Sequence, residues 1–115
     1  MSEDIPAVRI LLTTVATTQD AERIATTLVA EQLAACVNIL PGVRSVYRWQ
    51  GKVESAEECL LLLKTDEQHR PRLETRLKEL HPYDLPELLV LAPEGGSAQY
   101  LAWIADCLGH RHLDH

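Results

Sequence analysis

Residues 36–65 read CVNILPGVRSVYRWQGKVESAEECLLLLKT, and this stretch holds the strongest signal for the topology of the chain. Apolar and β-branched residues stand on both sides of Gln50-Gly51, which predicts two antiparallel strands joined by a two-residue turn. A turn at this place sets Tyr47 opposite Glu54. Pro41-Gly42 interrupts the first strand and predicts a bend there, because proline cannot donate to the ladder of hydrogen bonds. The stretch therefore forms one long, bent β-ribbon.

The segment before the ribbon has a strand pattern followed by a helix pattern. Val8–Val15 is aliphatic and β-branched, which predicts a strand. Between Asp20 and Ala35, apolar residues recur every three or four positions, the spacing of an amphipathic helix. Thr17 stands three residues before Asp20, as in a capping box, and is expected to cap this helix.

The segment after the ribbon continues the alternation. A second helix is expected after about Gln68, with Asp66 or a neighbour as its cap, and it must end before Pro82. A last strand at 87–91 and a short helix capped by Ser97 complete the order. Strand, helix, strand, strand, helix, strand is the ferredoxin-like βαββαβ arrangement. We therefore predict an α+β sandwich with an extra C-terminal helix.

Composition limits the classes of function. A chain of 115 residues, 46% hydrophobic and 24% charged, predicts one folded domain over 1–115, with its core at about 8–108 and flexible ends at 1–6 and 109–115. The net charge of −6 argues against nucleic acid as a partner. No stretch is long enough for a membrane span, and the acidic start does not fit a secretory signal. Three widely spaced cysteines fit a reducing compartment, so we expect a cytoplasmic protein.

The predicted strands contain too many leucines for a sheet that exposes one face to solvent. Such a sheet alternates apolar and polar residues, whereas 10–12, 59–63 and 88–91 are apolar at consecutive positions. Leucine is therefore expected on both faces of the sheet, and something must cover the second face. Short strand ends under a loop are one explanation; association of several copies through their sheets is the one we favour.

The ribbon also holds the first candidate site. Its register sets Tyr47 and Trp49 on one side together with Glu58 and Lys64, a pair of aromatic rings beside a carboxylate and an ammonium group. These four residues are the predicted ligand-binding set. The alternative is that the rings are core or interface anchors and that the carboxylates are merely solvated.

His81 is the second candidate. A histidine held at a helix end by Pro82 points in a fixed direction, as a metal ligand or general base must, and Glu87 is near enough in sequence to orient it. The alternative is a histidine favoured there by the helix dipole alone. Three further histidines in the tail could bind copper or nickel loosely: His110, His112 and His115. Cys36 and Cys59 are expected to be small buried hydrophobes. No nucleophile, phosphate loop or zinc motif indicates an enzyme.

Five blocks in this order resemble the CutA divalent-cation tolerance proteins. They are the strand start at 34–39, Ser45-x-Tyr47-x-Trp49-x-Gly51, Glu58 with Lys64-Thr65, the run from His81 to Glu87, and Tyr100-Leu101-x-Trp103. The resemblance spans about residues 9–103. It implies a cytoplasmic homotrimer, similar in architecture to the PII signalling proteins and associated with tolerance of copper and other divalent cations.

The resemblance also sets expectations for metal binding. The copper site proposed for the family uses a thiol near the end of the first strand and a histidine before the Pro-Tyr pair. Here the first position is Thr13, and the second is His81. One imidazole without a thiolate binds a soft metal weakly, so weakly bound Cu²⁺ or another divalent cation is expected, with no cofactor required.

Two other functions stay open at this point. The chain could be a PII-like sensor that binds an anionic small molecule in a cleft between subunits, with Lys64 holding the charge and Tyr47 and Trp49 stacking on it. It could also be an inert scaffold for other proteins, a class that the family suggests through its role in anchoring an enzyme in animals.

Overall fold

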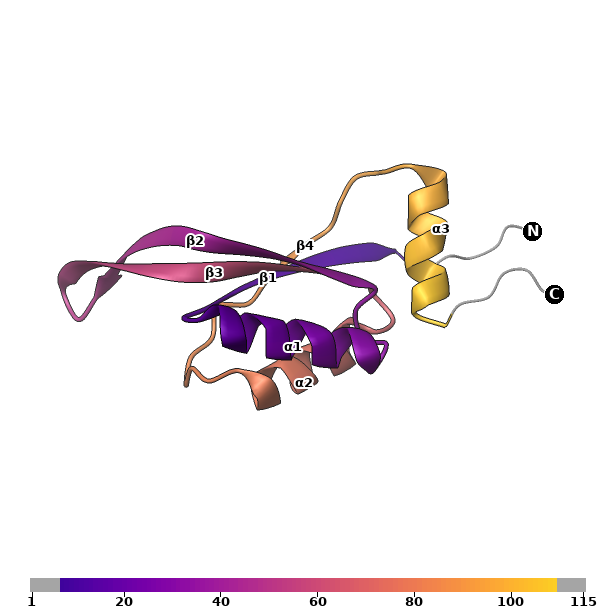
Figure 1. Ribbon diagram of the computed structural model, residues 1–115. Helices are drawn as coiled ribbons and strands as arrows, with labels where there is room; N and C mark the ends of the chain where they lie inside the picture. The colour runs from indigo at the N-terminus through magenta and orange to yellow at the C-terminus, as the bar shows by residue number, and fades with distance from the viewer. Residues whose placement is uncertain (1–6, 110–115) are drawn as a thin grey trace.

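A computed structural model describes residues 7–109 as a four-stranded antiparallel sheet with three helices (Figure 1). The strands lie in the order β2-β3-β1-β4, so the predicted ferredoxin-like α+β arrangement with an extra C-terminal helix is confirmed. The predictions for 1–6 and for the tail histidines lie outside the described residues. The elements are β1 (Val8–Val15), α1 (Thr18–Ala30), β2 (Cys36–Trp49), β3 (Lys52–Asp66), α2 (Arg70–Leu80), β4 (Leu89–Leu91) and α3 (Ala98–Cys107).

The ribbon has the predicted register. Tyr47 pairs with Glu54, and Trp49 pairs with Lys52 across the turn. Gln50 and Gly51 both have positive φ, at 50° and 80°, the conformation that a two-residue hairpin turn needs and that glycine adopts without strain. The predicted bend is a β-bulge, because the pairing shifts by one residue between Leu40 and Val43.

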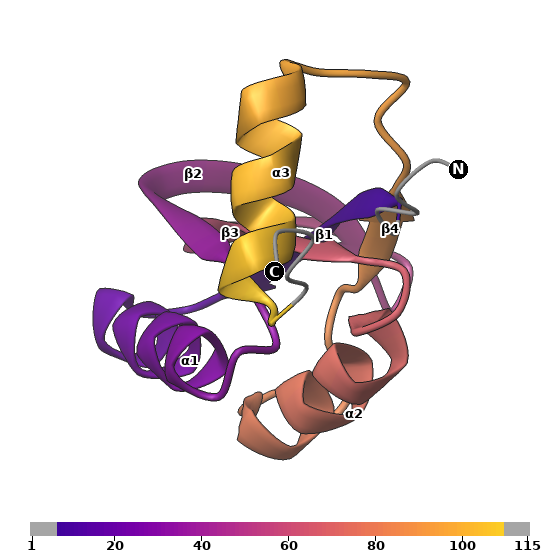
Figure 2. The same cartoon turned by 90° about the vertical axis from the view of Figure 1, so that its right-hand side faces the viewer.

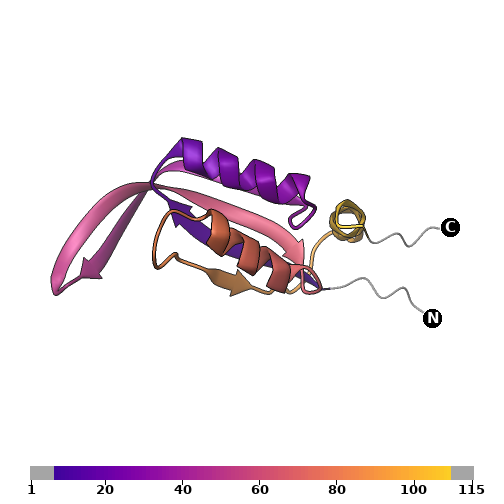
Figure 3. The same cartoon turned by 90° about the horizontal axis from the view of Figure 1, so that it is seen from below.

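The core lies between the sheet and the first two helices. Side chains at odd positions in 11–15 of β1 and in 59–65 of β3, such as Leu11 and Leu61, are buried on this face. They meet Ile24 and Leu28 from α1 and Leu73 and Leu77 from α2. Figure 3, seen from the helix side, shows the two helices lying side by side over the strands. Burial of these leucines is the main stabilisation of the fold.

The first helix differs from its prediction at its C-terminal end, and the second has the predicted bounds. α1 ends at Ala30 and not at Ala35, because Gln32 adopts a positive φ of 59° and turns the chain so that Leu33 and Ala34 enter the core. Thr17 caps its start as predicted, accepting a hydrogen bond from the Asp20 amide at 3.1 Å. α2 begins after Gln68 as predicted, and its N-cap is His69, a near neighbour of Asp66. Asp66 accepts hydrogen bonds from the backbone amide and ring of His69.

Two smaller differences concern strands at the edges of the sheet. β4 spans only Leu89–Leu91, shorter than the predicted 87–91, because Glu87 lies in the preceding loop with its carboxylate directed at Thr14. Cys59 is buried as predicted, whereas Cys36 is half-buried, since β2 is an edge strand with one open side.

The opposite face of the sheet is apolar but largely without a helix. α3 covers only its end, where Ile104 and Leu108 pack on Ala35 and Val8 (Figure 2). The remainder, which we call the uncovered face, consists of leucines from all four strands: Leu12, Leu40, Leu60, Leu62, Leu89 and Leu91. Leucine therefore lies on both faces, as the sequence predicts.

The far part of the ribbon extends beyond the helices. We call residues 43–58 the arm; in Figure 1 it projects from the body of the molecule on the side opposite α3. It contributes to a longest dimension of 55 Å, about twice the other two. A two-stranded ribbon is marginally stable without neighbours, so contacts at the base of the arm matter for its position.

Candidate functional site

A cavity of about 760 Å³ lies at the base of the arm, between β2, β3 and the loop that follows α2. Three aromatic rings, three aliphatic side chains and three carboxylates line it. The lining residues are Thr14, Ser45, Val46, Tyr47, Trp49, Ala56, Glu58, Tyr83, Asp84, Leu85 and Glu87. We call this cavity the arm pocket.

The bulge at Pro41-Gly42 explains how the arm pocket acquires its rings. Two residues of β2 stand there opposite one residue of β3, so the odd positions of β2 change sides. Tyr47 and Trp49 consequently lie on the same side of the ribbon as Glu58. The structure thus brings together three of the four residues that the sequence assigned to a ligand site.

Lys64, the fourth residue, lies elsewhere. It shares the face of β3 with Glu58 but stands six residues further along, a separation of roughly 20 Å in a strand. Its Nζ donates to the Tyr100 hydroxyl at 3.2 Å and lies 5.5 Å from the centre of that ring, which stacks on Trp103. The arm pocket of one subunit therefore has no lysine among its lining residues. An anion held by Lys64 in a cleft between subunits stays a prediction.

Tyr83 connects the loop to the arm. Its hydroxyl donates to Glu58 Oε2 at 2.9 Å, which joins the loop after α2 to β3. Burial, together with the carboxylate of Glu58, raises the pKa of Tyr83 to about 12. The phenol therefore stays protonated and acts as a fixed donor. The sequence drew attention to the His-Pro-Tyr run through its histidine, but the tyrosine is the residue that enters the pocket.

His81 lies behind Tyr83 and is only 7% exposed. Its Nε2 is 2.9 Å from the Thr14 carbonyl, which can only accept, so Nε2 carries the proton. Its Nδ1 accepts from the Tyr83 amide at 3.1 Å. Burial lowers the pKa of His81, which keeps the ring neutral. The sequence suggested that Glu87 orients this ring, but in the structure Glu87 Oε1 lies 3.5 Å from the Thr14 hydroxyl.

The surroundings of His81 do not form a ready metal site. Both ring nitrogens take part in hydrogen bonds, so a metal ion could reach one only after a bond breaks. Thr13, which replaces the thiol of the family's proposed site, has its hydroxyl 3.1 Å from Nε2. Within residues 7–109, no three histidine, cysteine or acidic side chains come close enough together to hold an ion. Metal binding by His81 stays a prediction.

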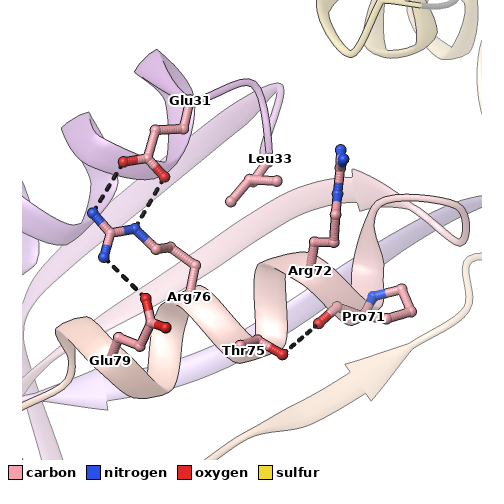
Figure 4. A pocket seen from close by; sticks show the side chains of 7 residues that line it. All are labelled: Glu31, Leu33, Pro71, Arg72, Thr75, Arg76 and Glu79. Carbon is pink, nitrogen blue, oxygen red and sulfur yellow. Dashed lines mark hydrogen bonds and ion pairs between the residues drawn. The ribbon is translucent and has the colours of Figure 1, made fainter.

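A second cavity, of about 510 Å³, lies between α1 and α2 (Figure 4). Its charged groups bind one another: Arg76 donates to both oxygens of Glu31 at 3.0 Å and to Glu79 at 3.1 Å. Hydrogen bonding to Arg76 lowers the pKa of Glu31. Figure 4 shows these ion pairs joining the two helices, so this groove is better explained as a helix contact than as a ligand site.

Comparison with known proteins gives one consistent family. A family profile described as "CutA1 divalent ion tolerance protein" matches residues 9–107. The "Divalent-cation tolerance protein CutA" of Pectobacterium atrosepticum is 51% identical over 84 residues, which cover 73% of this chain and 76% of that protein. The "Protein CutA 1, chloroplastic" of Oryza sativa is 41% identical over 103 residues, covering 90% of this chain and 58% of the relative.

Solved structures agree with the sequence comparison. The crystal structure of the divalent ion tolerance protein CutA1 from Ehrlichia chaffeensis superposes with a TM-score of 0.88 at 30% identity. The similarity covers 92% of this chain and 99% of that one, so it includes the sheet, the helices and the arm.

Proposed function

Because this chain belongs to the CutA1 divalent ion tolerance family, we propose that it contributes to the tolerance of divalent cations, copper in particular, as a homotrimer. The observation that carries the proposal is the family match, which spans residues 9–107 and so leaves no element of the fold outside it. The proposed role involves no catalysed reaction.

The uncovered face supports the trimer. Leu40, Leu89 and Leu91 are 40%, 55% and 47% exposed, and they adjoin half-buried leucines of β1 and β3. A continuous apolar surface of this kind is typical of an interface between subunits. A PII-like trimer would place the sheets of three copies around one axis and would give the arm a neighbour to rest on.

The chemistry around His81 supports weak metal binding. Cu²⁺ binds imidazole well, but here it must first displace the hydrogen bond to Thr14 or to Tyr83, and Thr13 offers a hydroxyl where a thiolate would bind a soft ion more firmly. Isothermal titration with Cu²⁺ is expected to give weak, saturable binding in the parent protein and a smaller heat in His81→Ala, which keeps the tail histidines. Equal heats for both proteins would remove His81 from the proposal.

The compartment is part of the same proposal. None of the helices within residues 7–109 has the length and apolar run that crossing a bilayer requires. We infer a cytoplasmic location from the free cysteines within residues 7–109, although the rice relative is named for the chloroplast. Fractionation of cells producing the full chain, followed by immunoblotting, tests this directly.

Complementation tests the role as a whole. The full chain is produced in a bacterial strain that lacks its own member of the family, and growth is followed as Cu²⁺ in the medium rises. The parent chain is expected to restore growth at high copper, and His81→Ala is expected to restore less. A matched control, His69→Ala, removes a buried histidine that is remote from Thr13 and Thr14. No rescue by a stably produced parent chain would refute the proposal.

A further inference from the structure

We propose that the arm pocket binds a small organic cation that carries an ammonium group. The first observation is its charge. Glu58, Asp84 and Glu87 line it, and no lysine, arginine or histidine is among its lining residues. Three carboxylates around one cavity create a negative potential that attracts a cation and repels an anion. The inference concerns a ligand other than the metal ion of the proposed function and stands on different groups.

The second observation separates an organic cation from a metal ion. The carboxylates stand around a cavity of about 760 Å³ and do not converge, since no three acidic, histidine or cysteine side chains in residues 7–109 form a cluster that could hold an ion. Divalent ions need several oxygen ligands within about 2.6 Å of one point. Carboxylates spread over a wider cavity suit a larger, diffuse cation instead.

The aromatic rings give the third observation. Tyr47 and Trp49 line the pocket and are 45% and 55% exposed in the single chain, so part of each ring is accessible. An ammonium group over such a ring gains a cation–π attraction, which is largest for tryptophan. The alkyl part of an organic cation also gains from contact with the rings, whereas a hydrated metal ion gains little from them. The pocket volume falls within the range of small-molecule sites.

Two of the three carboxylates already contact a neighbouring hydroxyl group in the free protein. Glu58 accepts from the Tyr83 hydroxyl through Oε2 only, and Glu87 contacts the Thr14 hydroxyl through Oε1 only. Within residues 7–109, the second oxygen of each carboxylate has no protein partner. Both second oxygens can therefore accept N–H bonds from a ligand without breaking the contacts that position the side chains.

The test uses the two tryptophans of the chain. Trp103→Phe leaves Trp49, in the pocket, as the only tryptophan, so its fluorescence reports on this cavity. The protein is titrated with n-butylammonium, with butyrate as an anion of equal size, and with Zn²⁺ as a metal ion. A saturable change in Trp49 emission with n-butylammonium, absent with butyrate, is expected.

Variants identify the groups responsible. Glu58→Gln and Glu87→Gln, each in the Trp103→Phe background, are expected to raise the dissociation constant for n-butylammonium about tenfold. Glu57→Gln is the matched control, because it removes the same charge from the neighbouring residue, which does not line the pocket. Circular dichroism checks that each variant is folded. If Glu58→Gln does not fold, Glu87→Gln alone tests the role of the carboxylates.

Four outcomes would overturn the proposal. They are no saturable response to n-butylammonium, an equal response to butyrate, a response to Zn²⁺ alone, and an effect of Glu57→Gln as large as that of Glu58→Gln. The first of these is also the result expected if a second copy of the chain fills the pocket. None of them bears on copper tolerance in cells, so failure here is distinguishable from failure of the proposed function.

Discussion

Replacing Leu89 by aspartate should break the proposed trimer without unfolding the subunit. Leu89 lies in β4 opposite Leu12, on the uncovered face, and more than half of it is exposed in the single chain. A charged side chain at an exposed position costs the isolated subunit little. In an assembly that covers this face, the same charge must leave water, which is strongly unfavourable.

The size of the effect follows from the exposed part of the side chain. Complete burial of a leucine contributes about 1.5–3 kcal/mol, so burial of the exposed half contributes about 0.8–1.5 kcal/mol in each subunit. Three equivalent positions in a trimer give about 2–5 kcal/mol, before any cost of burying the carboxylate. A loss of this size lowers the assembly constant by about 1.5 to 3.5 orders of magnitude, and burial of the carboxylate lowers it further.

Sedimentation velocity over a range of protein concentrations measures this directly. The parent chain is expected to sediment as a trimer at micromolar concentration and Leu89→Asp as a monomer, with unchanged circular dichroism. Val29→Asp is the matched control, because Val29 is 40% exposed but lies on α1, away from the uncovered face. A parent chain that is monomeric, or a Leu89→Asp variant that assembles like the parent, would refute the reasoning.

Three further predictions concern the subunit. Leu61→Ala removes a fully buried leucine between the sheet and the helices and should lower the free energy of unfolding in urea by about 2–5 kcal/mol. Burial lowers the pKa of His81, so below about pH 6.5 the unfolded chain binds a proton that the folded chain does not. The free energy of unfolding should therefore fall as the pH drops below about 6.5, and it should fall less steeply in His81→Gln. Ultraviolet titration should find the pKa of Tyr83 near 12, and Glu58→Gln should lower it only in part because burial, the larger cause, persists.

The ribbon was predictable because its information is local. A two-residue turn and a period of two fix which residues pair, so the register of Tyr47 with Glu54 followed from the position of Gln50-Gly51 alone. Pro41-Gly42 likewise marked the bulge, since proline and a glycine with φ of 72° disturb pairing by their own geometry. The end of α1 was less predictable, because alanines that favour a helix were turned into the core by tertiary contacts.

Side-chain alternation along the strands was the only feature of the sequence that predicted which residues share the site. Alternation says which side chains share a face, and it placed Tyr47, Trp49, Glu58 and Lys64 together. It does not limit the distance along that face, so Lys64 was assigned to a pocket from which it is remote. The contributions of Tyr83 and Glu87 depend on how the loop after α2 passes the end of β1, which no local pattern specifies.

The same loop links the two proposed ligands. His81 holds the loop through the Thr14 carbonyl and the Tyr83 amide, and Tyr83 in turn holds Glu58 at the arm pocket. A metal ion that takes either nitrogen of His81 must break one of these bonds, and so it weakens the attachment of the loop or of Tyr83. Binding energies at two such sites are coupled reciprocally. The present position of Glu58 favours a cation in the arm pocket, so a bound cation would lower the affinity of His81 for a metal ion. The bound metal ion would lower the affinity of the arm pocket for the cation by the same factor.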